Sequence, residues 1–542
     1  MKRVAVVGSG LAGLTIAHIL ANSDDYVVDI YEKSGRIGMS SQSASVNFSS
    51  GEVPDLHPVD APMRMIAPGY YPNLMSLIEH FDIELVRAKI YSTIFSYEKL
   101  EDDIKIKEKL FDFNTIKNAS IWNLSQSLYK SGILGIEYAR FLTTAAYFKI
   151  TGKSNDLNCS LIEFVTERGY STEFIRTLLI PYISSLVTCS LKDVEQYPAK
   201  VIFDFFEIGA FNSKLYKVKG GVNTMCEKLL DHPKINMIPI GVKSIKLNTK
   251  DQSSKKLVIT TDDDIEELYD DVIIATPPKQ AHQLLKHQST SFNDILGDIR
   301  CTPVKVTTHS DTSCMTHPKT EWAPNNLYID EEYIQHGTIT TDTFCDANHP
   351  IDFTSGMNHT YINASQPHIQ GDINVIQTTN PLVPIREDLI IKSGVFWRAY
   401  FDPSSEQNID KLDKLQGTDN IWVVGSYTFP GVPLLEGCIA NSIRIAKAMG
   451  ASAPWISEKD SNHPINKYNI PGTSTKQSLT QAYYTSAKVN FQKLPYLYQI
   501  VTLMFMIMIE CMLSVQLFYP LTLLIFLLIN SARLVLTTLI QI

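Results

Sequence analysis

The chain has 542 residues, long enough for two or three domains around a large buried core, and 44% of them are hydrophobic, as in an ordinary globular protein. The formal net charge of -9, without a long basic run, argues against a nucleic-acid partner. The 8 cysteines show neither CxxC nor metal-finger spacing, so we expect reduced thiols in a cytosol-facing protein and no metal site.

The first predicted element is a short apolar strand over residues 3–7, which runs into a G-x-G-x-x-G turn and then a helix over 14–21. This order is typical of dinucleotide-binding domains. Gly8 permits the tight turn, Gly10 lets the backbone approach a pyrophosphate, and Gly13 lets the helix pack closely on the strand. Free N–H groups at the helix start would bind the phosphates. The predicted cofactor contacts here are Gly8, Gly10, Leu11, Ala12 and Gly13.

A second strand is predicted over residues 27–31 and is followed by Glu32. A carboxylate about 20 residues after the glycine motif is placed to accept hydrogen bonds from the ribose hydroxyls of a bound dinucleotide. The first strand begins almost at the initiator Met, so we expect no cleavable targeting peptide ahead of it.

Two further parts of the chain interrupt the nucleotide-binding pattern. Helices are expected over residues 133–150 and 161–187, both rich in aromatic and aliphatic side chains. Short strands are expected over 302–309 and 389–397, separated by Asn, Asp and Pro clusters. We interpret these parts as a substrate domain inserted into the nucleotide domain.

The predicted fold class is therefore α/β, with a Rossmann-like, three-layer FAD/NAD(P)-binding domain and an interleaved α+β substrate domain. The FAD-binding domain is expected to comprise residues 1–95, 216–295 and 416–452. The substrate domain is expected to comprise residues 96–215 and 296–415.

The C-terminal part is predicted to be a linker followed by a membrane anchor. Residues 453–493 form the linker, because the stretch 451–480 is rich in Ser, Asn, Pro, Lys and Thr and is expected to be solvated. Residues 494–542 form a C-terminal transmembrane helical tail, since Glu510 is the only formal charge between residues 494 and 529. That run is nearly twice the roughly 20 residues that span a bilayer.

The number of membrane helices stays open. Pro520 favours two segments near 496–516 and 520–540 over a single helix. Basic residues just ahead of the tail predict that the catalytic domain faces the cytosol. Glu510 and Arg533 either pair with each other in a hairpin or mark a re-entrant segment.

Over roughly residues 1–450 the sequence resembles the flavin amine oxidase superfamily, which includes monoamine oxidases, protoporphyrinogen oxidases and phytoene-type desaturases. It is most similar to a branch of predicted FAD/NAD-binding oxidoreductases in that superfamily. Five patches carry the resemblance: Glu32 to Gly38; Val59 to Arg64 with Tyr71 to Leu74; Val218 to Val222 with Ile240 to Val242; Asp271 to Pro278; and Ile421 to Ser426 with Gly431 to Gly437.

The resemblance implies FAD, held non-covalently, as the cofactor. The first patch departs from the family pattern at Met39 and Ser40, where Gly and Arg are common, so Arg36 would carry the cationic role alone. The helix predicted from about Leu434 would aim its N-terminal N–H groups at the flavin ring. Cys438 is expected to be a packed helix residue. The resemblance adds these predicted cofactor contacts: Lys33, Arg36, Met63, Arg64, Val242, Gly425, Ser426, Pro433 and Leu434.

The implied activity is hydride transfer between an organic substrate and the flavin, for which no catalytic triad is needed. Candidate catalytic groups are Arg64 and Tyr427, and more loosely His57; for each, a purely structural role is at least as well supported. The predicted anchor and the aromatic substrate domain favour an apolar lipid-like substrate, such as a fatty acyl or isoprenoid chain. The open alternatives are an amine oxidase, a flavin-free carrier of lipid cargo similar to the Rab escort and dissociation-inhibitor proteins, and a membrane-tethered FAD protein with only a structural role.

Overall fold

The computed structural model describes residues 1–486 apart from 41–42, 63, 100–103, 113–125, 153–156, 212–213, 249–255, 287–290, 316–317, 338–342, 347–348, 353–355, 370, 458–459, 461–462, 469 and 472–476. Two predictions therefore lie outside the described residues, namely the cofactor contact Met63 and the membrane anchor over residues 494–542. In the part of the chain that is described, no helix combines the length and apolar character needed to span a bilayer.

A five-stranded parallel sheet forms the centre of the nucleotide-binding part. Its strands are almost wholly apolar, and Val4, Ala5 and Val6 are fully buried, as expected when layers cover both faces. The predicted Rossmann-like α/β fold is confirmed. In sheet order the strands are β21 (Ile421–Val423), β13 (Asp271–Ile274), β1 (Lys2–Val7), β2 (Tyr26–Tyr31) and β9 (Ile235–Ile238).

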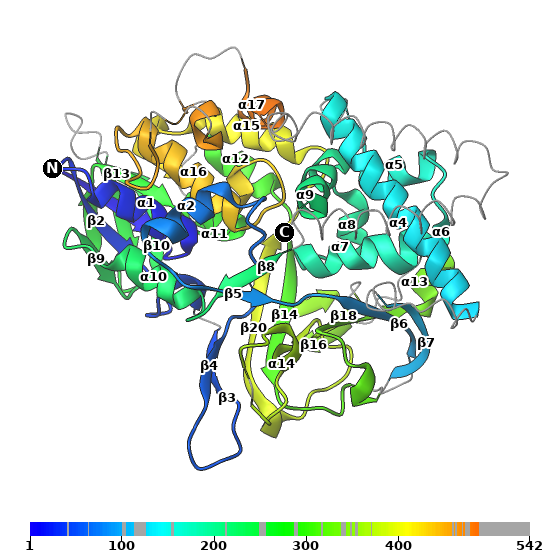
Figure 1. The fold of residues 1–542 in the computed structure, drawn as a ribbon. Coiled ribbons are helices and arrows are strands. Elements are labelled where there is room, and N and C mark those ends of the chain that lie inside the picture. The colour runs from blue at the N-terminus through cyan, green and yellow to red at the C-terminus, as the bar shows by residue number, and fades with distance from the viewer. Residues whose placement is uncertain are drawn as a thin grey trace, which may run out of the picture.

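Helices and a small antiparallel sheet cover this central sheet (Figure 1). Helix α1 (Leu11–Ala21) is buried along its whole length and packs against α10 (Val222–Leu230) and α16 (Leu435–Ala448). The small sheet contains β10 (Val242–Leu247), β11 (Leu257–Thr261) and β12 (Glu266–Tyr269). Tyr269 connects it to the central sheet, because its hydroxyl donates to Asp29 of β2 at 2.9 Å.

A seven-stranded, mostly antiparallel sheet forms a separate part of the molecule, below the nucleotide-binding part in Figure 1. Two of its strands precede residue 113, and the others come from the region in which short strands were predicted. In sheet order they are β20 (Ile390–Ala399), β14 (Cys301–His309), β19 (Ile376–Thr379), β18 (Met357–Tyr361), β15 (Asn325–Asp330), β6 (Ser92–Lys99) and β7 (Ile104–Asp112).

A group of helices lies beside both sheets (Figure 1). The helical stretch predicted over residues 161–187 is helical for most of its length but divided, because Gly169 adopts φ +66° and Ser171 caps a new helix start. These helices are α4 (Gln126–Thr151), α5 (Leu161–Glu167), α6 (Thr172–Phe174), α7 (Ile180–Val187), α8 (Leu191–Gln196) and α9 (Ala199–Phe211), with a π-helical turn (Ile175–Leu179) between α6 and α7.

Shorter elements connect these parts. The remaining strands are β3 (Ala44–Asn47), β4 (Leu56–Val59), β5 (Leu85–Ala88), β8 (Leu215–Val218), β16 (Thr343–Asp346) and β17 (His349–Asp352). The remaining α-helices are α2 (Pro72–His80), α11 (Pro278–Leu284), α12 (Ser291–Asp298), α13 (Glu331–His336), α14 (Ile362–Ser365), α15 (Ser405–Leu415) and α17 (Leu479–Ser486).

Several described residues after 452 are packed against the protein, so the prediction of a solvated stretch over 451–480 is wrong for these residues. Ala453, Ile465 and Leu479 are buried in the main core. The ring of Tyr483 lies 5.6 Å from that of Phe429, and its hydroxyl donates to Asp204 at 2.5 Å. The polar composition suggested that the segment is exposed, but its few apolar side chains are enough to pack it against the core.

Candidate functional site

The glycine turn after β1 has the shape that a bound dinucleotide requires. Gly8 has φ +105°, and a Cβ there would lie 3.0 Å from the carbonyl oxygen of Ala275. A Cβ on Gly13 would lie 2.1 Å from the carbonyl oxygen of Gly8, so only glycine allows α1 to start this close to the turn. A Cβ on Gly10, by contrast, would meet nothing within 4 Å. Open space therefore lies in front of Gly10, where a pyrophosphate is expected to approach.

Glu32 lies beside this turn in a defined position. Its carboxylate accepts hydrogen bonds from the Ser9 hydroxyl at 2.7 Å and from the Ser34 backbone N–H at 2.9 Å. Burial raises the pKa of Glu32, but these hydrogen bonds outweigh it and hold the pKa below its ordinary value. Glu32 is therefore ionised near neutral pH and can accept hydrogen bonds from a sugar.

The segment after Glu32 folds back onto the glycine turn. The backbone N–H of Gly38 donates to the Ser9 hydroxyl at 2.8 Å. Lys33 lies next to Gly241, whose added Cβ would be 3.2 Å from that of Lys33, and Val242 begins β10 directly after it. Arg36 is exposed in the same segment. The structure thus brings the predicted contacts from two distant stretches of the chain to one side of the turn.

The corner at Gly425 meets the glycine turn at the carboxyl edge of the central sheet. Val424 donates its backbone N–H to Ile274 at 2.9 Å, so β21 ends beside β13, which in turn ends beside β1. The hydroxyl of Ser442 in α16 donates to the carbonyl of Ala12 in α1 at 2.9 Å. The middle of α16 therefore packs against the start of α1. Pro433 and Leu434, at the start of α16, keep accessible surface.

Glu436 joins α16 to the start of α2. Its carboxylate accepts the backbone N–H of Asn73 at 3.1 Å and that of Leu74 at 3.2 Å, and also the side-chain amide of Asn73 at 2.5 Å. The carboxylate thus lies at the positive ends of two helices. Burial nevertheless raises the pKa of Glu436 to about 7, and the hydrogen bonds offset only part of that rise.

Two arginines lie near this junction. Arg64 precedes α2, and its Nε is buried without a hydrogen-bond partner. Arg398 ends β20, and its Nε donates to the Thr188 hydroxyl at 2.7 Å. Burial and the neighbouring charge of Arg398 lower the pKa of Arg64 to about 10, so Arg64 still carries its charge at neutral pH. Arg398 was not predicted as a site residue, because it follows an ordinary strand pattern with no motif around it.

The remaining candidates have structural partners. The Tyr427 hydroxyl donates to the carbonyl of Thr276 at 3.0 Å, and burial raises the pKa of the phenol. His57 lies 2.9 Å from Asp55 in the β3–β4 hairpin, which projects from the body of the molecule in Figure 1. The structure does not bring His57 to the carboxyl edge of the sheet. Cys438 packs within α16, as expected.

A second group of buried polar side chains lies in the seven-stranded sheet. His309, Cys314 and His359 each place a potential ligand atom within 4.8 Å of the others. The hydroxyl of Thr378 lies 2.7 Å from one nitrogen of each imidazole, and burial lowers the pKa of His309 to about 4. Hydrogen bonding to Thr378 accounts for one nitrogen of each imidazole. The absence of a metal site stays a prediction.

Comparisons with known proteins bear on this site. Residues 6–81 match the family of NAD(P)-binding Rossmann-like domains, and residues 139–305 match the prenylcysteine lyase family. No curated protein sequence matches the chain.

Among solved structures, the fold is similar to a candidate protoporphyrinogen oxidase from Exiguobacterium sp. 255-15, with TM-score 0.52, 13% identity and coverage of 83% of this chain and 98% of that one. It is also similar to a fatty acid isomerase from P. acnes that produces CLA, with TM-score 0.52, 14% identity and coverage of 82% and 98%. A redesigned putrescine oxidase gives TM-score 0.51, 11% identity and coverage of 82% and 98%. At this level of identity the structures establish the fold, and together with the family matches they fit the flavin amine oxidase superfamily.

The buried carboxylate of Glu436 predicts a pH dependence of stability. Its folded-state pKa of about 7 lies above the ordinary value of 4.5. The folded protein therefore binds the extra proton, and the stabilisation is complete below pH 4.5 and is lost as pH rises through 7. The loss is on the order of 3 kcal/mol. The thermal unfolding midpoint of the wild type should fall relative to that of Glu436→Gln as pH rises from about 5 to about 8, because only the wild type ionises there.

Glu79→Gln is the matched control, since Glu79 is an exposed carboxylate in the neighbouring helix α2. Its unfolding midpoint should follow the wild-type pH profile. Parallel profiles for the wild type and Glu436→Gln would contradict a raised pKa at Glu436.

Proposed function

We propose that this protein is an FAD-dependent oxidoreductase that transfers a hydride between an apolar, lipid-like substrate and the flavin. The observation that carries the proposal is the meeting of the glycine turn and the Gly425 corner at one edge of the sheet, with open space in front of Gly10. The unpartnered Nε of Arg64 nearby also fits a bound polar group.

The chain's own residues divide the work of holding FAD. Backbone N–H groups at the start of α1, including those of Leu11 and Ala12, would bind the pyrophosphate, and the Glu32 carboxylate would accept the ribose hydroxyls. Lys33, Arg36 and Val242 would lie along the nucleotide. Pro433 and Leu434 would contact the flavin ring at the start of α16. These roles are proposals supported by the placement of the residues around the turn.

Bound FAD would supply the hydride acceptor, and the protein would supply position and electrostatic field. The positive end of α16 favours negative charge at its start, which is where the reduced ring would need stabilisation. Arg64 adds a full positive charge to that region. The buried Tyr427 packs the corner through its bond to Thr276, so we assign it a structural role rather than proton transfer.

The substrate side of the site favours an apolar ligand. Aromatic rings run from Tyr70 before α2 into the helical part, with centroid separations of 5.1 Å from Tyr70 to Phe205 and 5.8 Å from Phe205 to Phe206. Phe206 continues to Phe141 at 5.6 Å. This helical part overlaps the stretch that matches the prenylcysteine lyase family, and one similar structure is a fatty acid isomerase. Both support a lipid-like substrate.

The alternative of an amine oxidase is supported by the likeness to a putrescine oxidase. However, two arginines beside the site would repel a cationic amine. The alternative from another class is a flavin-free carrier of lipid cargo. Such a carrier would not need the open space in front of Gly10. The charges and the aromatic rings together therefore favour the hypothesis of a lipid-like substrate.

Residues 494–542 are proposed to anchor the enzyme to a membrane, with the catalytic part on the cytosolic side. The support is the long apolar run of the sequence alone. An anchor of this kind would keep the enzyme close to substrates dissolved in the bilayer.

If FAD binds at this site, alanine substitutions at Gly10 and Gly13 should have different effects. Gly10→Ala should leave the unfolding midpoint of the flavin-free protein unchanged, because open space surrounds the added Cβ, but should lower the FAD content about tenfold or more by blocking the pyrophosphate. Gly13→Ala should lower the unfolding midpoint itself, because its Cβ would clash with Gly8. FAD is measured by absorption after extraction. A Gly10→Ala protein with wild-type FAD content would place the pyrophosphate elsewhere.

The substrate class predicts which compounds reduce the bound flavin. Under anaerobic conditions, lipid extracts should bleach the flavin absorption of the purified full-length protein, whereas soluble amines such as putrescine should not, because the arginines repel cations. Bleaching by amines alone would support the amine oxidase alternative. A colourless purified protein would support the flavin-free carrier.

The anchor predicts how the protein fractionates. The full chain should sediment with membranes and resist extraction at high salt, while a variant ending at residue 493 should remain in the supernatant with its FAD. Equal distribution of the two proteins would contradict an anchor in residues 494–542.

A further inference from the structure

The guanidinium groups of Arg64 and Arg398 lie close enough to interact electrostatically, and the surrounding protein desolvates both. Arg64 comes from the loop before α2, and Arg398 comes from the end of β20 in the other sheet. Each is close enough to Tyr71 and Cys438 to interact with both electrostatically. Among the described residues neither arginine forms an ion pair, and the Nε of Arg64 is buried without a hydrogen bond.

Asp60 attracts Arg64 electrostatically but forms no ion pair with it among the described residues. Asp60 lies 3.7 Å from the buried Lys217 and accepts the backbone N–H of Val222 at 3.0 Å. Glu436 is committed to the start of α2. The other neighbours are the Cys189 and Cys438 thiols and the Tyr71 and Tyr197 phenols, and burial raises the pKa of each, so they stay neutral.

The region therefore carries excess positive charge. An unpaired charge in the protein interior costs several kcal/mol, so buried arginines are normally paired or hydrogen-bonded to an anion. Both arginines keep some accessible surface although the surrounding protein desolvates them. Each guanidinium group can therefore still be reached by an anion.

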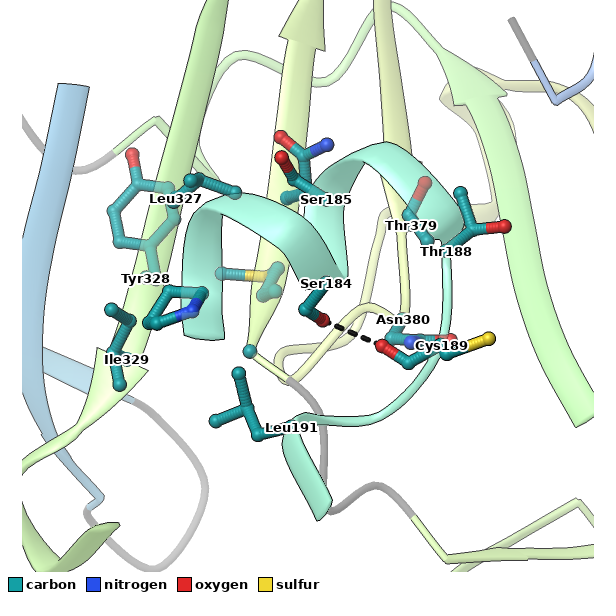
Figure 2. A pocket seen from close by; sticks show the side chains of 14 residues that line it. Ser184, Ser185, Thr188, Cys189, Leu191, Leu327, Tyr328, Ile329, Thr379 and Asn380 are labelled. Carbon is teal, nitrogen blue, oxygen red and sulfur yellow. Dashed lines mark hydrogen bonds between the residues drawn. The ribbon is translucent and has the colours of Figure 1, made fainter. Parts of the chain in front are cut away.

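Thr188 holds Arg398 in place at a conformational cost. Its hydroxyl accepts the Nε of Arg398 at 2.7 Å and donates to the carbonyl of Val187 at 2.8 Å. Thr188 adopts φ +54°, a left-handed conformation that is rare for a β-branched residue. Figure 2 shows Thr188 at the end of α7 near Cys189 and Asn380, on the wall of a cavity between this helix and the seven-stranded sheet.

The position of Arg398 separates this site from the pyrophosphate. The phosphates are expected at the glycine turn after β1, whereas Arg398 belongs to β20 and is held by the helical part of the protein. An anion bound here would therefore be part of the substrate. The planar guanidinium matches a carboxylate through two parallel hydrogen bonds.

We propose that Arg398, positioned by Thr188 and assisted by Arg64, binds a carboxylate at one end of the apolar substrate. The inference rests on the proposed function and narrows its substrate class to free lipid-like acids. Their esters and amides would lack the charge that the two arginines require. The aromatic rings that extend from Tyr70 would accommodate the apolar chain.

The test uses the full-length, FAD-loaded protein with oleate, methyl oleate and dodecyl phosphate as probes, and calorimetry as a readout independent of the flavin. The wild type should bind oleate about tenfold or more tightly than methyl oleate. Arg398→Met should remove this difference in affinity, because only the binding of oleate becomes weaker. Arg398→Lys should retain part of the difference. The FAD content should not change in either variant.

Thr188 provides a milder pair of variants that keep the fold. Thr188→Val retains the β-branched shape but lacks the hydroxyl, so oleate binding should weaken severalfold, whereas Thr188→Ser should restore it. Arg386→Met is the matched control, because Arg386 is an arginine of the same region whose side chain is 63% exposed. Its binding of all probes should equal that of the wild type.

Three results would overturn the inference. Equal binding of oleate and methyl oleate by the wild type would exclude a carboxylate site, and preferential binding of dodecyl phosphate would assign the arginines to a phosphate. Loss of FAD from Arg398→Met would assign Arg398 to the cofactor.

A separate result would bear on the proposed function alone. A wild-type protein without FAD that still prefers oleate would refute the proposed oxidoreductase but would support the carboxylate site.

Discussion

The structure depends on one close contact, the approach of helix α1 to the turn that follows β1. The contact exists because Gly13 carries no side chain where a Cβ would lie 2.1 Å from the carbonyl of Gly8. It sets the start of α1 at the edge of the sheet and allows α16 to pack beside it through the bond from Ser442 to Ala12. Parallel pairing of β1, β13 and β21 then brings three distant segments of the chain to the same edge. The candidate cofactor site is the result of that convergence.

Electrostatics divides the site into two regions. At the glycine turn the anionic groups of a ligand would meet backbone N–H groups and the starts of helices, which carry only partial charges. In the second region, Arg64 and Arg398 contribute full charges. Both are desolvated, so their interaction with an anion is much stronger than in water. Glu436 accepts hydrogen bonds from the start of α2 and forms no ion pair with either arginine among the described residues. The interior is thus arranged to receive the negative charge of the cofactor in one region and that of the proposed substrate in the other.

This division also explains how one fold can serve different substrates. The nucleotide-binding part is determined by backbone geometry, which tolerates little change. The proposed substrate side is formed by single side chains from the helical part and from β20, outside the nucleotide-binding sheet. The similar structures, which include a fatty acid isomerase and a putrescine oxidase, share the fold with this protein at 14% and 11% identity. The charge of the residues beside the flavin is therefore a better guide to substrate class than the fold.

The sequence by itself determined the features that depend on neighbouring residues: the glycine turn with its flanking strand and helix, the acid at Glu32, and the strand and turn at Gly425. Spacing and periodicity are local properties, so they can be read along the chain. Only the tertiary structure decided the rest. It broke the predicted helix at Gly169, packed Leu479 and Tyr483 where polar composition suggested a solvated linker, and set His57 apart in a hairpin. It also placed Arg398 near Arg64, a pairing of residues more than three hundred positions apart that no local pattern encodes, because burial and charge balance are fixed only when distant segments pack together.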